Sequence, residues 1–192
     1  KMNIYQSAVK LYPEDCRAYN NIGKIYYQQG NMDKAESYYK QSLQHKESPE
    51  ANMNLGLISL KKGDVAAAET YLGKAAGAEG LNEAMGNLYI AQGKYDQAVA
   101  SFGETKTNSA ALAQILAKNY NKARTTLDGI QTPDAYTDYL KAVLAARTNN
   151  PSAVTASLKK AVSANPSLAK KAAVDLEFAK YFTNADFMSI VQ

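Results

Sequence analysis

Small and large residues recur along the chain at spacings that predict helices packed in pairs. Three glycines are each followed, after 7, 12 and 16 residues, by a second glycine, an alanine and a large apolar side chain; the three are Gly23, Gly56 and Gly86. Their separations are 33 and 30 residues, so the spacing within a unit is fixed while that between units varies. A helical hairpin joined to the next by an adjustable loop has this property, because only the packing inside the hairpin is rigid.

The helix ends carry matching signals. In each unit the second glycine can end the first helix at a positive φ; these glycines are Gly30, Gly63 and Gly93. Polar caps before proline predict further helix starts after Ser48, Thr132, Asn150 and Asn165. We therefore expect helices over residues 15–29, 32–45, 49–61, 64–77, 81–92 and 94–105, then a shortened helix over 109–117, one helix from Leu168 to Phe178, and a last turn from Ala185 to Val191.

This order of small and large positions resembles the tetratricopeptide repeat, a helix-turn-helix unit of about 34 residues. The resemblance implies an all-α fold, a right-handed α-solenoid of antiparallel helix pairs with degenerate C-terminal repeats and a capping helix. We expect a single solenoid domain over 1–192: a half repeat (1–13), clear repeats (15–47, 48–78, 79–103), a shortened repeat (104–133), a degenerate repeat (134–166) and a C-terminal cap (167–192). Because residues 1–12 match a second helix without its first, we expect the natural protein to continue before Lys1.

Composition bounds the chemistry. The 22 basic and 18 acidic residues give a net charge of +4 and are spread through the chain, so no basic strip for nucleic acid is expected. No apolar stretch approaches the ~18 residues of a membrane span, so we expect no direct membrane insertion. The only histidine, His45, and the only cysteine, Cys16, are far apart in sequence. We therefore expect no catalysis, no metal site and no cofactor.

The resemblance also implies a site. In the family, fixed positions of each first helix line a concave groove that binds a protein or peptide segment. In this sequence we select, as partner-binding residues, Arg17, Asn20, Lys24, Tyr27, Gln28, Glu50, Met53, Asn54, Leu57, Lys61, Glu83, Asn87, Tyr136 and Tyr139. The family's clamp for a C-terminal carboxylate is not expected, because Gly80 and Ala84 stand where it needs basic residues.

Two functions remain open at this point. One is a non-catalytic scaffold that binds an extended or helical partner segment in the groove. The other is a structural spacer or assembly element of a larger protein, with the groove empty or filled by its own chain. Self-association through the N-terminal end is a further expectation, since Ile4, Tyr5, Ala8 and Leu11 form an apolar stripe there. The composition of the repeats, rich in Asn, Gln, Lys and Tyr, is similar to that of bacterial cell-envelope proteins.

Overall fold

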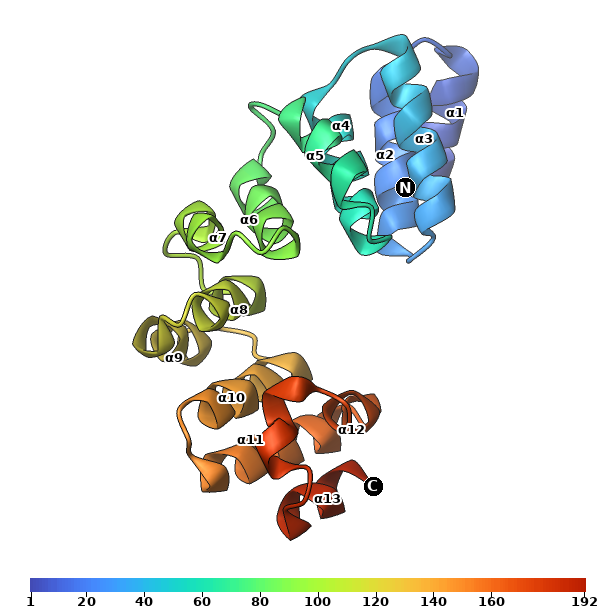
Figure 1. The fold of residues 1–192 in the computed structure, drawn as a ribbon. Coiled ribbons are helices and arrows are strands. Elements are labelled where there is room, and N and C mark those ends of the chain that lie inside the picture. Colours follow the sequence, from blue (N-terminus) through green and yellow to red (C-terminus); the bar gives the residue numbers. More distant parts are fainter. The chain divides into compact units, whose positions relative to one another are not determined.

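The computed structural model describes residues 1–192, which are all-helical and form two compact units, Lys1–Lys94 and Tyr95–Gln192 (Figure 1). Unit 1 contains α1 (Met2–Leu11), α2 (Cys16–Gln28), α3 (Met32–His45), α4 (Pro49–Lys61), α5 (Val65–Gly73) and α6 (Leu81–Ala91). Unit 2 contains α7 (Tyr95–Phe102), α8 (Asn108–Leu116), α9 (Tyr120–Asp128), α10 (Ala135–Arg147), α11 (Pro151–Ala164), α12 (Ser167–Ala172), the 3-10 helix η1 (Leu176–Tyr181) and α13 (Ala185–Val191). The predicted all-α fold of consecutive helix pairs is confirmed.

Glycine lets the two helices of a pair approach closely in unit 1. A Cβ atom on Gly23 would lie 2.8 Å from the Tyr39 ring, and one on Gly56 would lie 2.7 Å from Leu72 Cδ2. Tyr39 and Leu72 are almost fully buried, so neither can move aside freely. The small-against-large order read from the sequence is thus a packing requirement between α2 and α3 and between α4 and α5.

Gly56→Ala is therefore expected to lower the free energy of unfolding by about 1–3 kcal/mol, the usual cost of overpacking. A helical glycine with free space around it should behave in the opposite way, because alanine is the better helix former. Gly73, in α5, supplies this control, since a Cβ atom added there would meet nothing within 4 Å. Urea denaturation of Gly56→Ala and Gly73→Ala compares the two, and equal stability of both variants would contradict the close-packing argument.

Most predicted helices match the structure, but two of those predicted within residues 15–105 end earlier than expected. The helix expected over 64–77 ends at Gly73, because Gly77 and Gly80 adopt φ of +89° and +84° and turn the chain toward α6. The helix expected over 94–105 ends at Phe102, before Gly103 at φ +57°. Both segments contain good helix formers, so the left-handed glycines decided the ends.

Two of the four predicted caps are confirmed and two differ. Ser48 accepts a hydrogen bond from the Ala51 amide, and Asn150 accepts one from the Ala153 amide, as predicted. At Thr132 the prediction is wrong, because α10 begins at Ala135 and its cap is Asp134. The Asp134 carboxylate accepts from the Thr137 amide while the Thr137 hydroxyl accepts from the Asp134 amide, a reciprocal arrangement that satisfies two backbone donors. At Asn165 the N-cap of α12 is Pro166 instead, although Asn165 Oδ1 accepts a hydrogen bond from the Ser167 amide.

The core of unit 2 is closed by the C-terminal segment. Three aromatic side chains after residue 175 are buried against α10 and α11: Phe178, Tyr181 and Phe187. The single helix expected from Leu168 to Phe178 is wrong, because the α-helix stops after Ala172 and the chain resumes as η1. Asp175 marks the break, since its side chain caps η1 through the Glu177 amide and its other oxygen binds Tyr139.

The N-terminal helix is the least buried of unit 1. Helix α1 packs on α2 and has no buried residue, and three of its apolar side chains are largely exposed: Ile4 (70%), Leu11 (73%) and Tyr12, just beyond the helix (67%). Tyr5 and Ala8 are half-buried. Self-association through this end stays a prediction.

Candidate partner-binding surface

One face of α2 carries five of the selected residues. Arg17, Asn20, Lys24, Tyr27 and Gln28 follow the spacing of three and four residues that places side chains on one side of a helix. The other side of α2 packs inward through Ala18, Tyr19 and Ile22. Arg17, Lys24 and Gln28 are exposed, while Asn20 and Tyr27 are half-buried, so this face lies at the surface of unit 1.

Two contacts of α2 bear on its electrostatics. Asp15 caps the helix, accepting a hydrogen bond from the Arg17 amide at 3.0 Å, and it also binds the Arg17 guanidinium at 2.8 Å. The hydrogen bond from the Arg17 side chain lowers the pKa of the Asp15 carboxyl. Both side chains therefore stay ionised, and the negative charge of Asp15 balances the positive charge of Arg17. Asn20 has its Oδ1 atom buried without any hydrogen-bond partner.

Helix α4 contributes a second row of residues. Glu50, Met53, Asn54, Leu57 and Lys61 again follow helical spacing. Met53 and Leu57 are half-buried against the cluster that joins α4, α5 and α6, so they serve packing as well as surface. Asn54 is half-buried, and the charged ends of the row, Glu50 and Lys61, are exposed.

The two rows meet at their C-terminal ends. The Lys61 ammonium lies 4.5 Å from the centroid of the Tyr27 ring, a cation–π contact between α4 and α2. The Tyr27 ring also packs against the core cluster that contains Leu55 and Ile58 of α4. We name the shared face the α2–α4 surface and define it by Asn20, Lys24, Tyr27, Asn54 and Lys61.

The remaining selected residues of unit 1 lie on α6, which packs on α4 and α5. Glu83 and Asn87 are one turn apart on this helix, with Glu83 exposed and Asn87 half-buried. They extend the exposed polar character of unit 1 beyond α4, and Glu83 adds a negative charge there.

In unit 2 the selected residues are covered by the chain itself. Tyr139 is 2% exposed and donates a hydrogen bond of 2.6 Å to Asp175, with its ring edge-on to Phe178. Tyr136 stacks on Tyr139, and the Lys171 ammonium lies 4.9 Å and 5.2 Å from the two ring centroids. Burial and the bond to Asp175 raise the pKa of Tyr139, so its hydroxyl remains a donor. Tyr139 is thus not presented to a partner.

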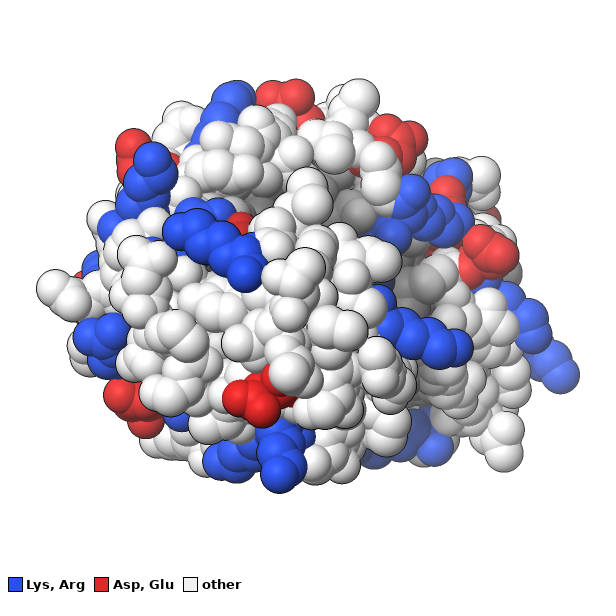
Figure 2. Space-filling view, turned by 60° about the horizontal axis from the view of Figure 1, so that its bottom comes forward, with Lys and Arg blue, Asp and Glu red and all other residues white.

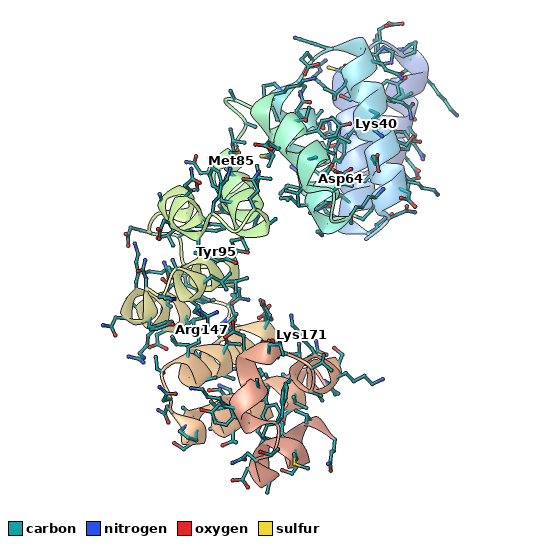
Figure 3. All side chains as sticks on the ribbon, in the orientation of Figure 1. Lys40, Asp64, Met85, Tyr95, Arg147 and Lys171 are labelled. Carbon is teal, nitrogen blue, oxygen red and sulfur yellow. The ribbon has the colours of Figure 1, made fainter.

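Arg147, at the end of α10, binds the C-terminal segment through Glu177. Its Nε atom donates to Glu177 Oε2 at 2.8 Å, its Nη2 donates to the other oxygen, and its Nη1 donates to the Ile115 carbonyl at 3.2 Å. The hydrogen bonds to Glu177 raise the pKa of Arg147. Figure 3 labels Arg147 of α10 and Lys171 of α12. The helical pattern signalled neither the acidic partners nor this covering role.

The reactive side chains are used in ordinary packing. His45 stacks on Tyr19 with the ring centroids 5.0 Å apart, and its Nδ1 atom lies 3.0 Å from Glu14. Cys16 is a free thiol at the start of α2. No group of three or more His, Cys, Asp or Glu side chains is arranged to hold a metal ion.

Family comparisons identify the repeats. Models described as "Tetratricopeptide repeat" match residues 16–49, 49–79 and 81–108. The chain is a tetratricopeptide repeat protein. A search of curated protein sequences gave no significant match.

Solved structures with the same fold are distant in sequence. A chain of the APC/C hetero-tetramer Cut9–Hcn1 aligns with a TM-score of 0.76 and 14% identity over the whole of this chain, which spans 39% of that one. PilW, described as a type IV pilus biogenesis factor, aligns with a TM-score of 0.67 and 21% identity, covering 93% of this chain and 88% of PilW. YrrB, described as a tetratricopeptide repeat protein with an unusual peptide-binding site, aligns with a TM-score of 0.56 and 18% identity, covering 86% and 94%.

The surface of this tetratricopeptide repeat protein has no single-sign stripe in view. Figure 2 shows basic side chains scattered over the visible face, several of them beside acidic ones. No helix has the length and apolar character needed to cross a lipid bilayer.

Proposed function

We propose that this tetratricopeptide repeat protein is a non-catalytic scaffold that binds an extended segment of a partner protein on the α2–α4 surface. Proteins of this family generally act as interaction scaffolds, which supports the general role. The observation that carries the specific proposal is the half-buried Tyr27 ring with the exposed Lys61 ammonium over it. Exposed Lys24 and half-buried Asn20 lie on the same face of α2, and half-buried Asn54 lies on α4. Tyrosine is enriched among interface anchors, and amide groups can pair with a peptide backbone.

Of the other selected residues, the proposal keeps those at the surface of unit 1 and leaves out the two tyrosines of unit 2. Arg17, Gln28, Glu50, Glu83 and Asn87 are at the surface of unit 1 and could border a bound segment. Tyr136 and Tyr139 are left out because the C-terminal segment covers them. Partners other than proteins are not proposed, since the 22 basic and 18 acidic residues are spread along the sequence and the face in Figure 2 shows no continuous basic stripe for a phosphate backbone.

A second function is favoured by one observation in unit 2. The face of α10 is filled by the chain's own residues 171–178, as the spacer hypothesis expects. We propose that unit 2 serves as a structural element and that partner binding is confined to unit 1. A bacterial cell-envelope setting stays a prediction that rests on the composition of the sequence.

The double variant Tyr27→Ala, Asn54→Ala is expected to weaken partner binding by about 2 kcal/mol or more, a loss of roughly 30-fold, if Tyr27 is an anchor. A pull-down from native lysate compares it with the wild type after circular dichroism has verified equal helicity. The matched control is Tyr38→Ala, because Tyr38 is a half-buried tyrosine on α3, where it stacks on Tyr26. Retention of the same partners at the same strength by the double variant would remove the α2–α4 surface from the proposal.

A further inference from the structure

The cations of the α2–α4 surface lack acidic partners. Lys24 lies one turn before Tyr27 on the same face of α2, and Lys61 stands over the Tyr27 ring. Neither lysine takes part in the ion pairs of unit 1, which use Arg17, Lys40, His45 and Lys62. One exposed lysine therefore has its ammonium group over the Tyr27 ring, a second lies one turn away on the same face of α2, and neither forms an ion pair.

Unit 2 shows what this chain places against such a set of groups. There, tyrosine rings with a lysine over them face an acidic stretch, Asp175-Leu176-Glu177-Phe178. Asp175 accepts from the Tyr139 hydroxyl, and Glu177 accepts from two nitrogens of Arg147. Phe178 is fully buried in the core of unit 2, whereas Leu176 is 81% exposed. Carboxylates and an aromatic side chain thus act together as the occupant of the α10 face.

Unit 1 also presents a tyrosine ring with a lysine over it, but no acidic residue of the chain binds there. In unit 2 the cation that binds the acidic stretch is Arg147, and on the α2–α4 surface the positive charge comes from Lys24 and Lys61. Tyr27 corresponds in chemistry to Tyr136 and Tyr139, and Lys61 corresponds to Lys171. We propose that the segment bound by the α2–α4 surface is acidic, with side-chain carboxylates next to an apolar or aromatic residue. This inference rests on the proposed function and names the chemistry of its partner.

The charges along the surface also give the bound segment a direction. Lys61 lies in the last turn of α4 and Lys24 in the second half of α2, whereas Glu50 lies in the first turn of α4 and Glu83 in the first turn of α6. The carboxylates of the segment sit at the Tyr27 end, because they would be repelled by Glu50 and Glu83. A free chain terminus is not needed, since the groups to be neutralised are the ammonium groups of Lys24 and Lys61.

Three synthetic peptides test the proposal directly. Each has about 12 residues, ~40 Å when extended, with the same Leu and Phe positions and with either Asp/Glu, Asn/Gln or Lys between them. Fluorescence anisotropy measures the Kd of each peptide with the full chain. The acidic peptide is expected to bind about tenfold more tightly than the Asn/Gln peptide, and the Lys peptide more weakly than both. The difference in Kd between the acidic and the Asn/Gln peptide should shrink between about 0.1 M and about 1 M salt, because the Debye length falls from about 10 Å to about 3 Å.

Charge reversal on the protein supplies the matched comparison. Lys24→Glu together with Lys61→Glu should remove the advantage of the acidic peptide. Lys34→Glu is the control: the Lys34 ammonium also lies over a tyrosine ring, 5.2 Å from the Tyr26 centroid, but Lys34 belongs to α3 and not to the α2–α4 surface. This variant should change the Kd of the acidic peptide less than about twofold.

The outcomes distinguish the acidic chemistry of the partner from the more general claim that the α2–α4 surface binds a segment. If the Asn/Gln peptide binds as tightly as the acidic one and Tyr27→Ala weakens both, the acidic partner is wrong and the α2–α4 surface still binds a segment. If no peptide binds, or if Lys34→Glu has the same effect as the double reversal, the acidic partner is also wrong. The proposed function itself then depends on the Tyr27→Ala, Asn54→Ala comparison with natural partners.

Discussion

Phe178→Ala is expected to destabilise unit 2 by about 3–5 kcal/mol, the usual cost of removing a buried phenylalanine. The ring is fully buried and lies 5.6 Å from the Tyr139 and Phe187 rings, measured between centroids. Its removal leaves a cavity and takes away two aromatic contacts from the segment that closes the core. Hydrogen exchange of the α10 and α11 amides measures the effect on unit 2 alone, since the two units need not unfold together.

The control for this variant lies two residues away. Leu176 belongs to the same 3-10 helix but is 81% exposed, so Leu176→Ala should stay within about 0.5 kcal/mol of the wild type. Similar exchange rates for α10 in the two variants would mean that residues 167–192 are a tether and not part of the core of unit 2.

Arg147→Ala is expected to cost about 2–3 kcal/mol in the same unit. The change removes the hydrogen bonds to Glu177 and to the Ile115 carbonyl, and it leaves the Glu177 carboxylate half-buried without its cation. Breaking a fully buried pair costs about 3–5 kcal/mol, but these side chains are 23% and 27% exposed, so solvent reduces the effect.

Arg124→Ala provides the comparison for Arg147→Ala. Arg124 is exposed on α9 and makes no ion pair, so its loss should change stability by less than about 0.5 kcal/mol. The double variant Arg147→Ala, Glu177→Gln should be more stable than Arg147→Ala alone, because it no longer carries an unpaired carboxylate. Equal exchange protection in Arg147→Ala and in the wild type would show that the pair does not hold the C-terminal segment in place.

Local signals in the sequence predicted the helix pairs of unit 1 well. The sequence has a large residue 16 positions after each glycine, and in the structure Gly23 lies against Tyr39 and Gly56 against Leu72. Such contacts depend only on helical spacing and a short turn. The end of α5 was missed because Gly77 and Gly80 lie in a segment whose other residues favour a helix. The start of α10 was missed because two capping residues, Thr132 and Asp134, flank one proline, and the contact with Asn108 is not visible in sequence.

From the sequence, only the helix face on which each candidate residue lies could be predicted. Helical spacing correctly places Lys24 and Tyr27 on one face of α2, because that spacing is a local property. The contact of Lys61 with Tyr27 joins two helices, and the burial of Tyr139 joins residues 36 positions apart, so both depend on tertiary packing. No spacing rule could have separated half-buried Tyr27 from Tyr136 and Tyr139, which the C-terminal segment contacts.

Photo-cross-linking from single positions tests most directly whether the α2–α4 surface binds a partner segment. A photoreactive phenylalanine analogue replaces Gln28, which is exposed next to Tyr27 at the end of α2, and in a second protein it replaces Lys40, which is exposed on α3. The account predicts a partner adduct from position 28 that disappears on addition of Tyr27→Ala, and little or none from position 40. Adducts from position 40 alone, or adducts from position 28 that persist with Tyr27→Ala, would contradict it.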